Sequence, residues 1–302
     1  MFPDEETATK WLEKTRWPDD RPCPHCGDCD TYKMKSGKPM PYRCRGCWKF
    51  FSVRTKTVME RSHIPLKKWV WAIYLSMTSL KGVSSMKLHR DLGISQRSAW
   101  FMAHRLREAM MPPARHRFEG PVEIDEVFMG GKRRNMSNKR RKQFSGRGAA
   151  GKTAVVGIKD RPSNQVAAKV IGKANRETVF PLISRHVQFG AVHYSDDSPI
   201  YEVLPNHWSV KHTLHEYVRG DVHTNGIESF WSMLKRAHAG TFHKLSVKHL
   251  HRYVNEFATR HNLRELDTIE LMRAVVARMI CKRLMYKDLT ADNGLPSGDR
   301  GQ

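Results

Sequence analysis

A helical repeat of apolar residues is clearest in the segment HTNGIESFWSMLKR, residues 223–236. Its apolar positions, three and four residues apart, are Ile227, Phe230, Trp231 and Leu234. This spacing predicts an amphipathic helix whose apolar side packs on the rest of the fold. Asn225 and Glu228 lie in the first turns, three residues apart, which is the spacing of a capping box. They therefore either cap the helix, or one of them binds a catalytic metal ion.

The region before this helix alternates between strand-like and helix-like patterns. β-rich and alternating runs predict strands at residues 121–129, 153–158, 165–171, 191–195 and 208–214. Helical periodicity predicts helices at residues 175–186, 198–204 and 245–260. The order is three strands, a helix, a strand, a helix, a strand and a helix, which is the order of the ribonuclease H fold. We therefore predict an α/β, ribonuclease H-like catalytic core in which the first and fourth strands lie side by side.

Acidic residues occur where this fold would bring strand ends together. Asp125 lies in the first strand, Asp196 follows the fourth, and the helix after the fifth strand brings Asn225 or Glu228 to the same place. Mg²⁺ prefers oxygen ligands, and two such ions ~3.5–4 Å apart can activate a nucleophile and stabilise a leaving oxygen. Each acid also has a structural interpretation: Asp125 as a strand-end acid, and Asp196 as the cap of the helix predicted at 198–204.

The chemistry favours Glu228 over Asn225 as the third ligand, because a carboxylate binds Mg²⁺ better than a neutral amide oxygen. Asn225 is then a cap or an auxiliary ligand. Lys235 lies two turns after Glu228 on the same side of the helix, so we expect it to point toward a DNA phosphate. We predict two Mg²⁺ ions in a site formed by Asp125, Asp196 and Glu228.

The amino-terminal segment contains two Cys-x-x-Cys knuckles, Cys23–Cys26 and Cys44–Cys47, separated by residues 27–43. This spacing is typical of a zinc ribbon, because each knuckle turns two thiolates toward one point and four thiolates complete a tetrahedral site. Such a site has no open position, so we predict a structural zinc rather than a catalytic one. We interpret the nearby Cys29 and His25 as bystanders.

Three helical patterns follow the knuckles. They predict helices at residues 65–82, 84–92 and 95–110. A short helix, a turn at Gly93 and a longer helix form the outline of a helix-turn-helix. The longer helix carries Arg97, Arg105 and Arg107, which we expect to face DNA. An ordinary helical bundle is the alternative interpretation.

The charge of the chain favours the DNA-binding interpretation. The formal net charge is +23 and the isoelectric point is about 10.0, an excess that indicates a polyanionic partner, most simply DNA. Between Lys132 and Lys152 the chain has nine lysines and arginines and no acid. We predict that this loop contacts DNA phosphates through Lys132, Arg133, Arg134, Arg140 and Arg141.

The first residues are polar and acidic, unlike a secretory signal, and the longest apolar run, residues 69–80, is shorter than the roughly 20 residues of a membrane span. Clustered cysteines suit metal binding in a reducing compartment. These features predict a cytoplasmic, nucleoid-associated protein with no membrane partner. We expect a zinc ribbon at residues 1–60, a helix-turn-helix segment at 61–114, the catalytic core at 115–265, and a carboxyl-terminal helix and tail at 266–302.

The same residues resemble a known family. The matching stretches are CPHCG (23–27), YRCRGCWKFFSVRTKTVM (42–59), VEIDEVFMGGK (122–132), HYSDDSPIYEVL (193–204), HTNGIESFWSMLKR (223–236) and HLHRYVNEFATRHN (249–262). The segment at 223–236 is the most specific of them. Together they resemble the bacterial insertion-sequence transposases that have an N-terminal zinc ribbon and a DDE-type catalytic core, of the ISXO2-like kind.

The resemblance implies an enzyme that cuts and rejoins the ends of its own mobile element with Mg²⁺. It implies that Asp125 and Asp196 are the first two catalytic acids, with Asp196 preferred to Asp197, and that the third place holds Asn or Glu. Because transposition brings two DNA ends together, a homo-oligomer on DNA is expected. The alternatives are a non-catalytic zinc-ribbon and helix-turn-helix protein on a decayed core, and a ribonuclease H-like nuclease without strand transfer. The intact acids argue against a decayed core.

Overall fold

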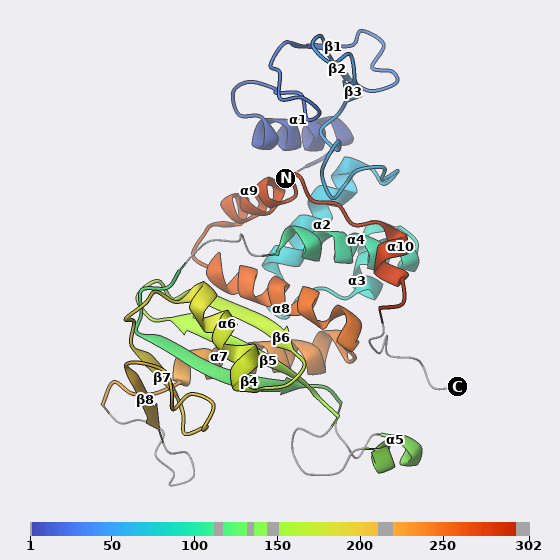
Figure 1. Cartoon of the computed structure of the whole chain (residues 1–302). Helices are drawn as coiled ribbons and strands as arrows, with labels where there is room; N and C mark the ends of the chain where they lie inside the picture. The colour runs from blue at the N-terminus through green and yellow to red at the C-terminus, as the bar shows by residue number, and fades with distance from the viewer. Residues whose placement is uncertain (1, 112–116, 132–135, 144–150, 211–219, 294–302) are drawn as a thin grey trace. The chain divides into compact units, whose positions relative to one another are not determined.

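The computed structural model describes residues 2–111, 117–131, 136–143, 151–210 and 220–293, without the side chains of residues 139, 140 and 143. The chain divides into two compact units. The first is Met1–Met110 with Leu266–Ala291, and the second is Met111–Glu265 with the residues from Asp292 onward. Figure 1 labels the elements of each unit. No helix among the described residues combines the length and the apolarity that a membrane span requires.

Helices make up most of the first unit. They are α1 (Glu5–Arg16), α2 (Leu66–Thr78), α3 (Ser85–Leu92), α4 (Gln96–Ala109), α9 (Thr268–Arg278) and α10 (Tyr286–Thr290). The apolar sides of α1, α2, α3, α4 and α9 meet in one core that includes Trp69, Ile73, Leu88, Leu106 and Met272. Because Met272 belongs to α9, a segment from the far end of the sequence is part of this core. The amino-terminal α1 packs against both α2 and α9.

Local hydrogen bonds determine where α3 and α4 begin. Ser84 and Ser95 each accept a hydrogen bond from the backbone N–H three residues later, at 3.2 and 3.1 Å. Gly93, in the left-handed region with φ 56°, ends α3. The two predicted helices are therefore confirmed. The expectation that Arg107 faces DNA is wrong, because Arg107 shares the core-facing side of α4 with Met110 and is only 4% exposed.

A small antiparallel sheet completes the first unit, with the strand order β1 (Thr31–Lys33), β2 (Tyr42–Cys44) and β3 (Phe50–Phe51). Tyr42 and Phe51 pair across β2 and β3, and their rings pack with that of Trp17. The buried cluster beneath the sheet has few other members, namely Cys23, Cys44 and the partly buried Cys47. So small a core supplies little stability by itself, and the sheet needs another source of it.

The second unit contains a five-stranded mixed sheet. Its strands are β4 (Val122–Met129), β5 (Thr153–Asp160), β6 (Val166–Ile171), β7 (His193–Asp196) and β8 (His207–Val210), in the spatial order β6-β5-β4-β7-β8. β4 is antiparallel to β5 and parallel to β7, and β7 is parallel to β8. The first and fourth strands of this unit are thus neighbours, which confirms that part of the prediction.

Helices cover both faces of this sheet (Figure 1). α6 (Arg176–His186) packs on one face, while α7 (Asn225–Ala237), the π-helical turn η3 (His238–Phe242) and α8 (Val247–Asn262) lie on the other. Residues 122 and 124 of β4 pack with α6, whereas residues 127 and 129 pack with α7 and α8, because successive strand residues point to opposite faces. A short helix, α5 (Asn138–Gln143), lies between β4 and β5 in the sequence.

The helix predicted in the segment 223–236 is confirmed as α7, and it approaches the sheet closely at Gly157 of β5. Gly157 pairs with Asp125 of β4. A Cβ atom at position 157 would lie 2.4 Å from Cζ2 of Trp231 and 2.8 Å from Cδ1 of Ile227. Glycine therefore allows the apolar side of α7 to press on the sheet directly beside Asp125.

The helix predicted at residues 198–204 is wrong, because the segment between β7 and β8 consists of turns and bends. The backbone forms two successive turns instead, in which the N–H of Tyr201 donates to the carbonyl oxygen of Ser198 and that of Leu204 donates to the carbonyl oxygen of Tyr201. Pro205 follows directly, and a residue that precedes proline, here Leu204, is disfavoured in the helical conformation. Asp196 does not cap a helix here. Its Oδ1 instead accepts a hydrogen bond at 3.3 Å from the backbone N–H of Ser198, in the turn that follows β7.

Candidate metal centres

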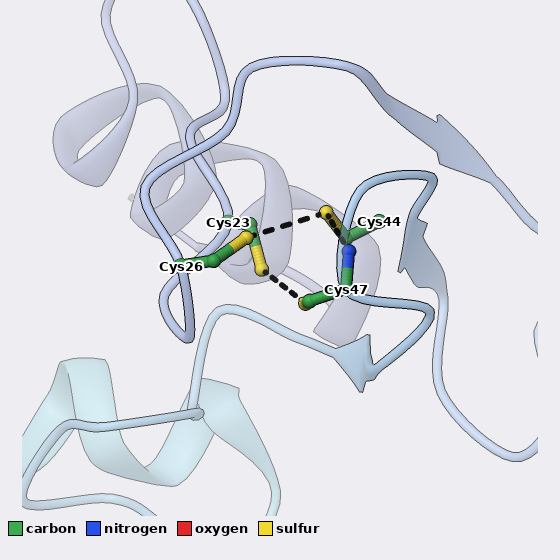
Figure 2. A group of neighbouring side chains, drawn as sticks. All are labelled: Cys23, Cys26, Cys44 and Cys47. Carbon is green, nitrogen blue, oxygen red and sulfur yellow. Dashed lines mark hydrogen bonds between the residues drawn. The ribbon is translucent and has the colours of Figure 1, made fainter.

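The four predicted thiols come together in the first unit, as Figure 2 shows. We call Cys23, Cys26, Cys44 and Cys47 the thiolate cluster. The Sγ atoms of Cys23 and Cys47 are 3.6 Å apart, as are those of Cys26 and Cys44, and all four lie within 4.8 Å of one another. A tetrahedral site with Zn–S bonds of ~2.3 Å places its sulfur atoms ~3.8 Å apart. The thiolate cluster therefore fits a zinc ion.

Tight turns present these sulfur atoms to one point. The backbone N–H of His25 donates to Sγ of Cys23, and that of Cys47 donates to Sγ of Cys44, at 3.4 and 3.5 Å. A hydrogen bond from the backbone N–H of Lys49 is the main cause that lowers the pKa of Cys47 to about 7. In the cluster without a metal, by contrast, burial raises the pKa of Cys23, and the hydrogen bond with Cys47 is the largest cause that raises the pKa of Cys26 to about 12. Cys47 is thus the member of the cluster closest to the thiolate form that binds a metal.

Two further residues with metal-binding side chains, Cys29 and His25, lie nearby in the sequence but do not belong to the thiolate cluster. Cys29 is exposed. The ring Nε2 of His25 lies 3.4 Å from the carbonyl oxygen of Phe50 rather than among the sulfur atoms. Cys23 and Cys44, by contrast, are buried. The arrangement is that of a site whose ligands are all supplied by the protein.

Carboxylates from two neighbouring strands meet in the second unit. Ligand oxygens of Asp125, Glu126 and Asp196, which we call the acid cluster, lie within 4.8 Å of one another. β4 carries the first two acids, and β7 ends at Asp196. In the pairing of β4 with β7, residues 122 and 123 lie opposite residues 193 and 194. The same register, continued along both strands, places Asp125 opposite Asp196. The cluster is half-buried, and its hard oxygen donors are of the kind that Mg²⁺ prefers.

Burial and mutual repulsion disfavour the ionised form of the carboxyl groups in the acid cluster. Burial is the largest cause that raises the pKa of Asp125 to about 7, and repulsion from Asp196, Glu126 and Glu228 adds to it. Burial also raises the pKa of Glu126, with a further contribution from Asp196. Repulsion among buried carboxylates is relieved by a bound cation. The electrostatics of the cluster therefore agree with its donor set.

The acid cluster lines a pocket of about 650 Å³. α7 and the turn after it supply the remaining lining residues Glu228, Trp231, Ser232, Lys235, Arg236 and Ala239. The pocket therefore brings Glu228 and Lys235 together with the predicted acids Asp125 and Asp196. Asn225 is exposed and is not part of this lining.

The start of α7 separates the roles of Asn225 and Glu228. Asn225 is the first helical residue and Thr224 precedes it, so the interpretation of Asn225 and Glu228 as a capping box is wrong. Thr224 Oγ1 donates a hydrogen bond to Oε1 of Glu228 at 3.0 Å. In the first turn, the backbone N–H of Ile227 donates to Oε2 of Glu123 at 2.9 Å. The hydroxyl of Thr224 thus holds the Glu228 carboxylate instead of capping the helix.

Glu126 is a site residue that the sequence analysis missed. Asp125 was the acid predicted from this strand, and its neighbour Glu126 points to the opposite face of the sheet, as alternate strand residues do. However, Oε1 of Glu126 accepts a hydrogen bond from Oη of Tyr201 at 2.5 Å, and Tyr201 is fully buried in the turns between β7 and β8. The carboxylate of Glu126 nevertheless lies within 4.8 Å of those of Asp125 and of Asp196, the last residue of β7. The adjacent Asp-Glu pair was the available signal in the sequence.

Two of the predicted DNA-contacting arginines lie on α4. Arg97 is exposed, and its guanidinium lies 4.5 Å from the centre of the Tyr286 ring in α10. Arg105 is half-buried, with its Nε donating to the carbonyl oxygen of Leu284 at 3.2 Å and its guanidinium over the ring of Phe101 at 4.3 Å. The carboxyl-terminal segment that contains α10 therefore contacts both arginines within the first unit.

The predicted basic loop is only partly described. Lys132, Arg133 and Arg134 lie outside the described residues, as does the side chain of Arg140. Arg141 is exposed in α5, and its Nη2 donates to the carbonyl oxygen of Met136 at 3.3 Å.

Comparisons with known proteins match the sequence segments that contain the two clusters. Residues 117–262 match the family model of the ISXO2-like transposase domain, and residues 3–49 match that of the transposase zinc-ribbon domain. The chain is 29% identical over 248 residues to an uncharacterised protein in transposable element ISH50 of Halobacterium salinarum, covering 78% of this chain and 83% of that protein. No solved structure matches. The two models together match well over half of the chain, which therefore belongs to the ISXO2-like insertion-sequence transposases with an N-terminal zinc ribbon.

Proposed function

We propose that the protein is an active DDE-type transposase. It binds the ends of its element, hydrolyses a phosphodiester bond there and joins the freed 3′-hydroxyl to target DNA. The observation that carries this proposal is the convergence of Asp125, Glu126 and Asp196 with Glu228 in one pocket. These acids come from distant segments of the sequence, which a protein that only bound DNA would not need.

In this proposal, Asp125, Asp196 and Glu228 are ligands of two Mg²⁺ ions. When bound, such ions lower the pKa of an attacking water or hydroxyl and stabilise the charge on the leaving oxygen. The protein's own contribution is to hold the ligands in place. Thr224 fixes the Glu228 carboxylate, and the exposed Lys235 and Arg236 at the same pocket bind the DNA backbone.

The rest of the chain supports binding to DNA in this proposal. The strand order of the second unit, with its central β4 and β7 parallel, supports assignment to the ribonuclease H-like fold. The capped helices α3 and α4 support a helix-turn-helix, and the net charge of +23 supports a polyanionic partner. We propose that the chain works as a homo-oligomer on DNA, with structural zinc in the ribbon, in the cytoplasm and associated with the nucleoid.

Two neighbouring aspartates provide a matched test. Asp196 belongs to the acid cluster, whereas Asp197 is exposed and does not line the pocket. With Mg²⁺ and labelled DNA from the element end, Asp196→Asn should lower strand cleavage by ~10³-fold or more, because several kcal/mol of charge stabilisation is lost. Asp197→Asn should cleave as the wild type does. Cleavage that survives Asp196→Asn would contradict the proposal.

A second assay separates a transposase from a nuclease with the same metal chemistry. A DNA end that already carries a free 3′-hydroxyl is incubated with the protein, Mg²⁺ and a target plasmid. Joined products are expected for the wild type and not for Asp196→Asn. Cleavage of intact ends without any joining of precut ends would assign the chain to the nucleases that lack strand transfer.

A further inference from the structure

The first turn of α7 is bound to a buried acid of β4. Glu123 is only 2% exposed, and a buried carboxylate is costly unless it is both paired and hydrogen-bonded. Nε of Arg161 donates to its Oε1 at 2.9 Å, and the backbone N–H of Ile227 donates to its Oε2 at 2.9 Å. One oxygen of Glu123 is thus bound to a cation, and the other is bound to the start of the helix.

The same guanidinium binds the residues that lead into α7. Nη1 of Arg161 donates to the carbonyl oxygen of Asp221 at 2.6 Å, and Nη2 donates to the carbonyl oxygen and to Nδ1 of His223, each at 2.9 Å. The guanidinium also lies 4.4 Å from the centre of the Tyr194 ring on β7. A planar group with several donors can join β4, β7 and this lead-in segment at once, which a lysine ammonium cannot.

This arrangement explains why the hydroxyl of Thr224 is available to Glu228. A threonine before a helix normally accepts a hydrogen bond from the first turn. Here the carboxylate of Glu123 accepts it, at a helix end where negative charge is favourable. Thr224 makes no side-chain cap bond and donates to Glu228 instead.

Gly226 allows the helix to begin so close to Glu123. A Cβ atom at position 226 would lie 2.7 Å from Oε2 of Glu123 and 2.8 Å from Nζ of Lys159. Oε2 is the oxygen that accepts the N–H of Ile227, so moving it aside would break that hydrogen bond. The glycine in HTNG, residues 223–226, is therefore part of the same arrangement.

We propose that Glu123 and Arg161, here called the α7 latch, are positioning residues that fix Glu228 relative to Asp125 and Asp196. Glu123 and Asp125 are two residues apart in β4, so they lie on the same face of the strand. The strand that supplies the first acid thus also holds the start of the helix that supplies Glu228. The latch acts through the position of α7 and does not itself bind metal or DNA. This inference rests on the proposed function.

The test uses the full-length zinc-loaded protein with two changes, which we call the latch variants. Arg161→Lys alters the latch itself, and Gly226→Ala places a methyl group against the Glu123 oxygen that accepts the N–H of Ile227. Matched controls are Arg264→Lys and Gly172→Ala. Arg264 binds the carbonyl oxygens of His261 and Asn164, and a Cβ atom at Gly172 would meet nothing within 4 Å. Binding of Mn²⁺ is measured by electron paramagnetic resonance without DNA, and cleavage of element-end DNA is measured across a range of Mg²⁺ concentrations.

Both latch variants should weaken Mn²⁺ binding and raise the Mg²⁺ concentration for half-maximal cleavage by about 10–100-fold, as residues that orient metal ligands do. DNA affinity should stay unchanged, and both controls should behave as the wild type. If the latch variants only lower the melting temperature, with unchanged Mn²⁺ binding and Mg²⁺ midpoint, the pair is merely structural and the inference is overturned. If the wild type binds Mn²⁺ without cleaving DNA, the proposed function fails, while Mn²⁺ binding alone still decides the latch.

Discussion

The thiolate cluster takes all of its ligands from the segment between Cys23 and Cys47, whereas the acid cluster combines β4 with the end of β7 and shares its pocket with α7. Beneath the thiolate cluster lies a small sheet with a few buried aromatic rings. Around the acid cluster lies a sheet with an apolar core on each face. The two clusters therefore stand in opposite relations to the fold around them. The thiolate cluster lies in a segment with little core of its own, which a structural zinc would stabilise, whereas the fold of the second unit holds together carboxylates that repel one another.

Loss of zinc should have the largest effect. Cys23→Ser removes one ligand, and the small sheet should then lose much of the ~10 kcal/mol or more that a structural zinc site contributes to folding. Elemental analysis should show loss of the zinc, and amide hydrogen exchange should accelerate across residues 23–51. Cys29→Ser, outside the cluster, should keep both the zinc and the protection. If the protein without zinc still showed protected amides in this segment, zinc would not be needed for its folding, and the two clusters would not differ in this respect.

The second unit should respond to ligand loss in activity rather than in folding. Glu228→Gln keeps the size of the side chain but removes the charge, so cleavage should fall by ~10³-fold, equivalent to about 4 kcal/mol, at a nearly unchanged melting temperature. Asn225→Ala should have a much smaller effect, because Asn225 is exposed and lies outside the pocket lining. If Asn225→Ala abolishes cleavage and Glu228→Gln does not, the two roles are exchanged.

Glu126 should contribute less than the three proposed ligands. Glu126→Gln should lower cleavage by about 10–100-fold, the range found when a residue that supports a metal site is changed. Tyr201→Phe removes the hydroxyl that binds Glu126 and should shift cleavage in the same direction by a smaller factor. Glu119→Gln changes an exposed acid before β4 and serves as the control. If Glu126→Gln cleaved DNA as the wild type does, Glu126 would have no role in the site, and only the acids predicted from the sequence would remain.

The two centres also differ in how well the sequence predicted them. The thiolate cluster was predicted in full, because two Cys-x-x-Cys knuckles are local features whose geometry follows from their spacing. Asp125 and Asp196 could be placed together only through the expected order of the strands. That order was recognisable because strand and helix periodicities differ, and the pairing of β4 with β7 confirmed it.

The remaining features depend on tertiary contacts that no local pattern contains. Glu126 belongs to the cluster through a contact with a distant residue, because the hydroxyl of Tyr201 donates a hydrogen bond to its carboxylate. The capping box at the start of α7 was wrong because Glu123, distant in the sequence, accepts the N–H of the first turn. The short helix at residues 198–204 was wrong because this segment forms two successive turns, from Ser198 to Tyr201 and from Tyr201 to Leu204, instead of a continuous helix.

The smallest predicted effect is on the free energy of unfolding, and it tests whether the charge of Asp125 destabilises the folded second unit. The pKa of Asp125 is about 7 in the folded protein, against an ordinary value of 3.8. Between these values the folded state holds a proton that the unfolded state has lost, so the acid lowers stability as the pH rises through this range. Without Mg²⁺, Asp125→Asn should therefore be more stable than the wild type near pH 8, by on the order of 1–2 kcal/mol, and the gain should shrink toward pH 5.5. Scanning calorimetry at both pH values measures this difference, and Asp197→Asn, at an exposed neighbour of the cluster, should show no gain.

Adding Mg²⁺ should stabilise the wild type more than Asp125→Asn, because the ion binds the charge that the variant lacks. Equal stability of the two proteins at pH 8 without Mg²⁺ would mean that the acid cluster carries its charge without cost, as an ordinary surface group does.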